Sequence, residues 1–206
     1  MENSKCLDMK YLQLSKVGEI IEIISICLGV FAIPLFVPQL LSAIFGATSV
    51  IASNSQYLVG SLVNMLLILA GVNTNGWKKV VGIVTLPSIS ALFGGLVLKT
   101  SSIYTLYMIP AIWVGNFAII YLYRYLFVKK NLNYIVTSII SIIIKCAAIY
   151  SGFRLLVLAT VIPGASKVFT ALNVAMGINQ LVTASIGAII AFGIILTMKK
   201  LNKENN

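Results

Sequence analysis

Long apolar runs, each about long enough to cross a bilayer, alternate along the chain with short polar and basic segments. A membrane-spanning helix needs about 20 apolar residues, and helices satisfy their own backbone hydrogen bonds in lipid. The runs lack the alternating ten-residue pattern of a membrane β-barrel. The pattern therefore predicts an all-α integral membrane protein with one domain over residues 17–198. Its six spans are predicted at roughly 17–44, 57–72, 80–98, 103–127, 132–153 and 168–198.

The first run is too long for one straight crossing and contains Pro34 and Pro38. Because proline removes a helical hydrogen bond and bends or ends a helix, we expect this helix to cross by about residue 36. An irregular or re-entrant segment would follow, and the small and polar residues at 45–56 would form a long first loop. The alternative of seven spans, with 36–53 as its own crossing, would place NTNGWKK (73–79) outside the cell.

Lysine and arginine residues favour six spans with both termini in the cytoplasm. In that topology the predicted outer loops hold only Lys99 and Lys167, while Lys145 and Arg154 lie in or at the edge of span five. Such asymmetry follows the positive-inside rule. Residues 1–16 become a cytoplasmic amphipathic lead-in and 199–206 a cytoplasmic tail. The predicted cytoplasmic basic residues are Lys5, Lys10, Lys16, Lys78, Lys79, Arg124, Lys129, Lys130, Lys199, Lys200 and Lys203.

Composition supports the membrane assignment and excludes several kinds of chemistry. The 206 residues are 59% hydrophobic and only 10% charged, and the mean hydropathy is +1.01, whereas a soluble domain is about a quarter charged. The net charge of +10 comes without a basic stripe interleaved with aromatics, so its expected partners are membrane lipids and not nucleic acid. The chain has no histidine and three scattered cysteines, which argues against a metal, a cofactor or a disulfide framework. It also lacks a P-loop motif, and we expect no enzymatic activity.

Lys145 is the most unusual residue, because it interrupts the apolar run SIIIKCAAIYSGF (141–153). A lysine at the centre of a membrane helix costs about 2.5–3.5 kcal/mol on insertion, which makes such a residue a functional hypothesis by default. All five acidic residues lie at positions 2–22 or at 204, far from this run. Either the amine is neutral, or an anionic group from outside the chain meets it.

Several polar residues are predicted at the depth of Lys145. Counting about 1.5 Å per helical residue places Trp113, Asn116 and Gln180 near its level, between mid-membrane and the outer side. By the same count Asn64 lies deeper and Asn173 further out. Trp113 and Asn116 share a face of span four, one turn from Pro110, which is typical of a pocket that combines an aromatic wall with a few polar groups.

Span six carries one stripe of polar and small residues at intervals of three and four. The outer part of the stripe is polar and could line a cavity, whereas its inner part is glycine and alanine, which suits close helix packing. For Gln180, lining a site and joining helices are equally good interpretations. The stripe consists of Asn173, Met176, Gly177, Gln180, Thr183, Ala184, Gly187 and Ala191.

The order of these features resembles the substrate-binding S components of energy-coupling factor (ECF) transporters, which import vitamins and other micronutrients in prokaryotes. The resemblance covers nearly the whole chain from about residue 17 and rests on loose patterns of small residues, proline, asparagine and glutamine. The segments that carry it are YLVGSLVNMLLILAG (57–71), TLPSISALFGG (85–95), PAIWVGN (110–116), IIKCAAIY (143–150) and AMGINQLVTASIGAIIA (175–191).

The resemblance implies an outward-facing pocket built mainly from helices four to six, with the 45–56 loop as its lid. Lys145 would anchor a negative or strongly polar part of the ligand, Trp113 would stack on it, and Asn116 and Gln180 would donate hydrogen bonds. Tyr150 and Asn173 complete the expected substrate-binding residues. The family also implies docking to a transmembrane T component and two ATPases. The small residues Ser25 and Gly29 on the first helix are the candidate docking positions, although the family typically has alanines there.

Two other kinds of function stay open on the sequence. A self-sufficient transporter or channel would need a continuous polar path, which the Gly, Ala and Ile residues of the inner part of span six do not offer. A membrane scaffold or redox-associated subunit would lack evident electron-transfer ligands. For the ECF interpretation we expect Lys145→Ala to weaken ligand binding at least about tenfold and to leave the fold intact.

Overall fold

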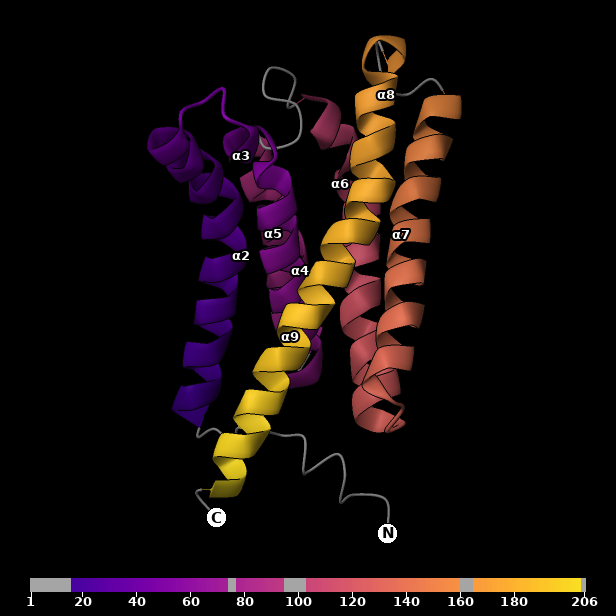
Figure 1. The fold of residues 1–206 in the computed structure, drawn as a ribbon. Helices are drawn as coiled ribbons and strands as arrows, with labels where there is room; N and C mark the ends of the chain where they lie inside the picture. Colours follow the sequence, from indigo (N-terminus) through magenta and orange to yellow (C-terminus); the bar gives the residue numbers. More distant parts are fainter. Residues whose placement is uncertain (1–15, 74–76, 95–102, 160–164, 205–206) are drawn as a thin grey trace.

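The computed structural model describes residues 16–73, 77–94, 103–159 and 165–204, and all regular elements within these ranges are helices. Successive long helices run in opposite directions, so that α2 begins at the end of the bundle where α9 finishes (Figure 1). The elements are α2 (Lys16–Phe45), α3 (Val50–Ser53), α4 (Ser55–Asn73), α5 (Trp77–Gly94), α6 (Ile103–Leu122), the π-helical η1 (Tyr123–Lys129), α7 (Tyr134–Leu158), α8 (Ala165–Met176) and α9 (Ile178–Glu204).

Length and composition identify this as an all-α, multi-pass membrane protein. Within the described ranges, five helical segments are long and apolar enough to cross a bilayer: Ile20–Phe45, Ser55–Asn73, Leu106–Lys129, Tyr134–Leu158 and Phe169–Lys200. The apolar part of α5, Lys79–Phe93, is shorter. The exposed side chains along the helices are largely Ile, Leu, Val and Phe, as contact with lipid requires and as a water-facing surface would not.

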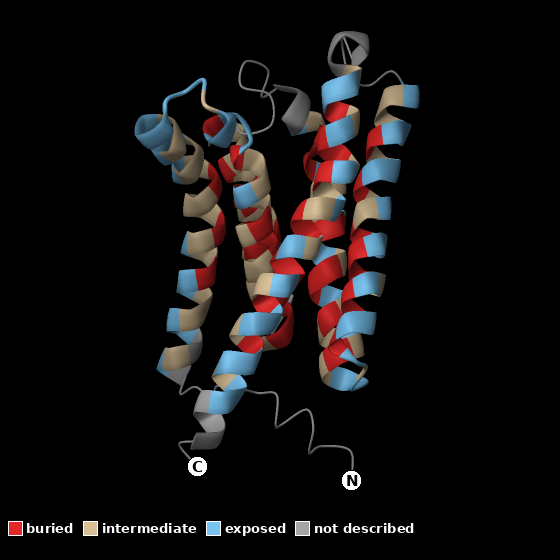
Figure 2. Cartoon of the chain, in the orientation of Figure 1, coloured by how far each residue is buried: buried red, intermediate tan, exposed pale blue. Residues whose placement is uncertain are grey.

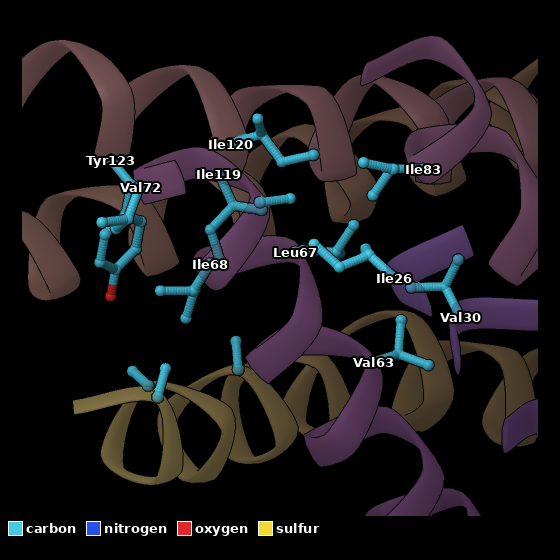
Figure 3. Close-up of a cluster of buried hydrophobic side chains, with 14 of the residues drawn as sticks. Ile26, Val30, Val63, Leu67, Ile68, Val72, Ile83, Ile119, Ile120 and Tyr123 are labelled. Carbon is cyan, nitrogen blue, oxygen red and sulfur yellow. The ribbon is translucent and has the colours of Figure 1, made fainter. Parts of the chain in front are cut away.

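The buried core joins the helices along their inward faces (Figure 2). Its centre is formed by α4, where Leu67 and Ile68 are fully buried against Ile119 and Ile120 of α6 (Figure 3). Ile26 and Val30 bring α2 into the same cluster, and Ile83 brings in α5. A second cluster around Met108, Phe153 and Leu172 joins α6, α7 and α8. The core thus holds the helices on both sides of the polar region described below.

The expectation that an irregular or re-entrant segment follows from about residue 36 is wrong. Helix α2 continues through Pro34 and Pro38 to Phe45, followed by a turn with Gly46 at φ +85° and the short helix α3. Proline is tolerated within a membrane helix because side chains of neighbouring helices can satisfy the backbone groups that it frees. The alternative with 36–53 as a separate crossing is wrong for the same reason, since residues 36–45 extend α2.

Two side chains from neighbouring helices donate hydrogen bonds to backbone carbonyls in the turn before a proline, each to the carbonyl three residues before it. The hydroxyl of Ser90 in α5 donates to the carbonyl of Phe31, three residues before Pro34. The side-chain amide of Asn116 in α6 donates to the carbonyl of Val84, three residues before Pro87, at 3.3 Å. A proline inside a helix loosens the turn that precedes it, which leaves such carbonyls available. Polar side chains of adjacent helices are therefore found inside the bundle next to Pro34 and Pro87, where they bond these carbonyls.

The predicted sixth span is not one continuous helix. Helix α8 ends at Met176, Gly177 forms a turn, and α9 begins at Ile178. The side chain of Gln180 donates from Nε2 to the carbonyl of Ala175 at 3.2 Å across this break. The glycine provides the turn, and the amide of Gln180 satisfies the carbonyl of Ala175 next to the break, as a helix interrupted within the membrane requires.

The described basic residues lie mainly toward one end of the bundle. The end of α4, the start of α5, the η1–α7 connection and the end of α9 share that end (Figure 1), and near them lie Lys79, Lys129, Lys130 and Lys199. Arg154 lies near the opposite end of α7, with its guanidinium 5.7 Å from the ring centre of Phe169. The lead-in up to residue 15, Lys99 and the connection 160–164 lie outside the described residues.

Candidate functional site

Lys145 lies inside the bundle and is hydrogen-bonded to two asparagines. Its side chain is only 2% exposed, and Nζ donates to Oδ1 of Asn64 in α4 and to Oδ1 of Asn116 in α6, the latter at 2.9 Å. The expected meeting of Lys145 and Asn116 is therefore present. No third hydrogen bond is made by Nζ within the described part of the chain, although an ammonium has three N–H donors.

The orientation of both asparagines is fixed by a second set of hydrogen bonds. Asn64 donates from Nδ2 to the carbonyl of Gly60 at 2.9 Å and to Oγ1 of Thr183 at 3.3 Å. Asn116 donates from Nδ2 to the carbonyl of Val84. Turning either amide around would place an NH₂ group against the amine and an oxygen against a carbonyl. Both amides therefore present acceptor oxygens to Lys145, an arrangement that suits an ammonium ion.

Asn64 was predicted to lie deeper than Lys145, but the two side chains meet. A helical side chain leans toward the N-terminus of its own helix. The N-terminus of α7 lies at the end of the bundle where α9 finishes (Figure 1), so the long side chain of Lys145 carries its nitrogen toward mid-bundle. Asn64, near the middle of α4, is then within reach.

A close approach between α6 and α7 brings Asn116 beside Lys145. Gly115 is the residue that allows it, since a Cβ atom there would lie 2.6 Å from Cγ1 of Ile149 and 3.2 Å from the carbonyl oxygen of Lys145. These distances are well inside van der Waals contact, so only glycine fits without moving α7. The sequence GN at 115–116 thus supplies both the close contact and the acceptor.

A cavity of about 110 Å³ borders this polar group. It extends along α4 from Gln56 to Asn64, which corresponds to about 12 Å of the bundle. It lies toward the end that carries α3, and α3 is preceded by Ser49, whose Oγ caps its N-terminus. The lining residues are Pro34, Gln56, Val59, Gly60, Val63, Asn64, Pro87, Ser88, Ala91, Ile112, Asn116, Lys145, Ala175, Met176, Asn179, Gln180 and Thr183.

Helix α9 contributes three polar residues to the cavity, of which Asn179 stands out. Asn179 is 5% exposed, and its Oδ1 accepts a hydrogen bond from the hydroxyl of Tyr57 at 2.8 Å. Its Nδ2 is buried and has no hydrogen-bond partner in the part of the chain that the structure describes. Gln180 lines the cavity and donates from Nε2 to the carbonyl of Ala175, within the same predicted span.

Trp113 does not line the cavity. Its indole Nε1 donates to Oγ of Ser88 at 2.7 Å, and its ring packs against the main core cluster. Ser88 does line the cavity. Trp113 therefore lies behind the wall and holds one of the residues that form it, whereas the sequence predicted a stacking surface for the ligand.

Trp113→Phe tests this placement. The variant loses the hydrogen bond to Ser88, so the free energy of unfolding should fall by about 1 kcal/mol. Ligand affinity should change by less than about threefold, because the indole does not face the cavity. Chemical unfolding in detergent and a binding titration measure the two effects. A tenfold loss of affinity at unchanged stability would instead place the indole against the ligand.

Tyr150 and Asn173 meet each other at a separate place. The hydroxyl of Tyr150 donates to Oδ1 of Asn173 at 3.1 Å, and both line an open groove of about 470 Å³ between α7 and the α8–α9 break. Neither residue is part of the cavity beside Lys145. Tyr150 is 38% exposed, and most other residues of the groove face the lipid side of the bundle. The structure thus divides the predicted binding residues between two places.

The two predicted docking residues on α2 face different surroundings. Ser25 is exposed. Gly29 is half-buried, and a Cβ atom there would lie 2.8 Å from Cδ1 of Leu66 in α4. Its close contact is therefore made within this chain. Of the pair, Ser25 alone lies on the exposed surface of α2.

Sequence reasoning did not select Asn64, Asn179 or Thr183 as members of the site. Asn64 was placed at another depth, and Asn179 lies one residue outside the stripe drawn on span six. A signal existed in the spacing of Asn179 and Thr183, which are one helical turn apart and both buried. The break at Gly177 changes which positions of span six face inward, and continuous helical periodicity could not include it.

The chain was compared with protein families, curated proteins and solved structures, and the site is interpreted from its geometry alone. No family model, no curated protein and no solved structure matches this chain.

Proposed function

We propose that this chain is the substrate-capture subunit of an ECF-type importer, crossing the cytoplasmic membrane six times with both termini in the cytoplasm. The observation that carries the proposal is the cavity beside Lys145, to which α2, α4, α5, α6, α7 and the α8–α9 segment all contribute. Ligand pockets of this kind combine apolar walls with a few converging polar groups. The residues 45–56 would close over the ligand from the α3 end.

The proposal accounts for the asymmetry of the polar residues. They gather in the half of the bundle that carries α3, whereas basic residues mark the opposite end. With basic ends in the cytoplasm, the cavity belongs to the outer half of the membrane. A capture subunit needs a site there and needs no energy source of its own, since a T component and two ATPases would supply the transport step. Ser25 and its exposed surroundings on α2 would contact the T component.

Mass spectrometry of small molecules released from the detergent-purified protein tests the proposal. We expect one low-molecular-mass compound to be released on denaturation in near-stoichiometric amount, and to be absent from a purified membrane protein of similar size. Co-purification from native membranes should in addition bring down a second membrane protein and ATPase subunits. Release of no compound, together with the absence of ATPases, would contradict the proposed function.

A self-sufficient transporter is the second candidate, because α7 carries buried hydroxyls below Lys145. Ser141 and Thr137 lie about one and two turns from it on the same face, are fully buried, and have no hydrogen-bond partner for their hydroxyls among the described residues. They give the inner half more polarity than span six alone indicated. Reconstitution of the chain alone in liposomes distinguishes the two candidates: uptake of the released compound without partners would favour the transporter.

A further inference from the structure

The proposed function leaves the ligand open, and the cavity restricts it by charge, size and shape. Resting on that function, we propose that the ligand is a compact, non-aromatic monocarboxylate. Its carboxylate lies against Lys145 and Asn179, and its short apolar remainder lies against the aliphatic wall.

The charge of the site selects an anion with a single negative charge. Among the described residues that line the cavity, Lys145 alone is charged, and its two partners are neutral amide oxygens. These amides orient the ammonium but leave its charge uncompensated. A buried charge without a counter-ion is costly, so a monoanion gains more here than a neutral molecule or a second cation. A dianion would bring an uncompensated charge of its own.

Lys145 and Asn179 each have an N–H donor without an acceptor among the residues that the structure describes, which an oxygen atom of the ligand can bond. Lys145 has one N–H beyond its two bonds, and Nδ2 of Asn179 has no partner within the described residues. Oδ1 of Asn179 is already occupied by the hydroxyl of Tyr57, which orients the amide. A carboxylate offers two oxygens and about four acceptor positions, so it can serve both donors.

The dimensions and walls exclude large and flat ligands. A cavity of about 110 Å³ is smaller than the roughly 150 Å³ that holds a benzene molecule in an engineered protein cavity. Within the described part of the chain no aromatic side chain lines the cavity, and the apolar part of the wall consists of residues such as Val59, Val63, Ile112 and Met176. A short aliphatic chain matches this wall, whereas an aromatic vitamin would find neither the space nor a stacking partner.

A set of three shape-matched probes tests the charge. Butyrate, butyramide and butylamine differ mainly in the polar group, and benzoate adds an aromatic ring to the carboxylate. Binding to the purified full chain is measured by calorimetry and by the shift in thermal unfolding. Butyrate should bind at least about tenfold more tightly than butyramide, because it adds a charge-assisted bond. Butylamine and benzoate should not bind.

Asn179→Asp provides the matched variant. An aspartate keeps the acceptor for Tyr57 but removes the free donor and introduces a negative charge beside Lys145. It should abolish butyrate binding and leave thermal unfolding of the ligand-free protein at least as high as in the wild type. Butyramide or benzoate binding as tightly as butyrate, or unchanged butyrate affinity in the variant, would overturn the inference and leave the capture function standing.

The compound identified by mass spectrometry decides the case in which none of the probes binds. Release of another compact aliphatic monocarboxylate supports the inference. Release of a cation, an aromatic compound or a larger molecule overturns it and still supports substrate capture. Release of nothing, with no ATPase subunits co-purifying, contradicts the proposed function itself, and the inference falls with it.

Discussion

Lys145→Met should lower ligand affinity at least about tenfold without lowering the thermal stability of the ligand-free protein. The affinity falls because the variant removes the charged donor that we assign to the ligand, and a charge-assisted hydrogen bond is worth about 1.5–3 kcal/mol. Methionine has a similar length and no charge, so it fills the same space between α4, α6 and α7. Calorimetric titration with the compound released from the wild-type protein measures the affinity.

The stability part of this prediction separates a binding lysine from a structural one. Burying an uncompensated ammonium costs several kcal/mol, which methionine avoids. Against this, the oxygens of Asn64 and Asn116 lose a donor at about 1–3 kcal/mol each, a loss that water in the adjoining cavity reduces. The two effects offset one another, and thermal unfolding should stay the same or rise.

Lys130→Met is the matched control, since it removes the same charge from an exposed lysine that stacks over Tyr125. It should leave ligand affinity unchanged. If Lys145→Met binds the ligand as the wild type does but unfolds at a lower temperature, Lys145 is a cross-link between helices and the anchor role is wrong.

Gly187→Ala should destabilise the protein by about 1–3 kcal/mol, the second large effect that we expect. A Cβ atom at this position would lie 2.7 Å from Cβ of Asn64, 2.8 Å from the carbonyl oxygen of Ser61 and 2.9 Å from the backbone nitrogen of Met65. Two of these atoms belong to the α4 backbone, so rotation of a side chain cannot relieve the overlap. Helices α4 and α9 must separate, and Asn64 must move with them.

Gly193→Ala provides the comparison within the same helix. A Cβ atom there meets nothing within 4 Å, and alanine is the better helix former by about 1 kcal/mol. The unfolding free energies of the two variants in mixed detergent should therefore change in opposite directions. Because Asn64 moves, Gly187→Ala should also weaken ligand binding. Equal stability of the two variants would show that α4 and α9 do not pack as described.

Much of the fold follows from the sequence because membrane helices depend mainly on hydrophobic length. The predicted spans correspond to α2, α4, α5, α6 with η1, α7, and α8 with α9. The errors occur where the outcome depends on neighbouring helices. Pro34 predicts the end of a helix by itself, but the hydroxyl of Ser90, from a different helix, bonds the carbonyl of Phe31 in the preceding turn. No local pattern contains that contact.

The site is predictable to a similar degree. An isolated lysine in an apolar run identifies Lys145, and depth along straight helices correctly brings it to Asn116. Depth alone does not give the rotation of a helix about its axis, which turns Tyr150 and Asn173 to another surface and Trp113 to the back of the wall. It also ignores the direction of a long side chain, which is why the nitrogen of Lys145 was not expected to meet Asn64.

The order of the hydrogen-bonding partners along the chain has a consequence for synthesis. Asn64 precedes Lys145 by 81 residues and Asn116 precedes it by 29, so both acceptors leave the ribosome before the charge does. When α7 is inserted, α4 and α6 are already available to receive the ammonium. Asn179 and Thr183 follow only with the last helix. Synthesis therefore supplies the acceptors for the lysine first and completes the cavity last, so the cavity that we propose as a ligand site is whole only once α9 has been made.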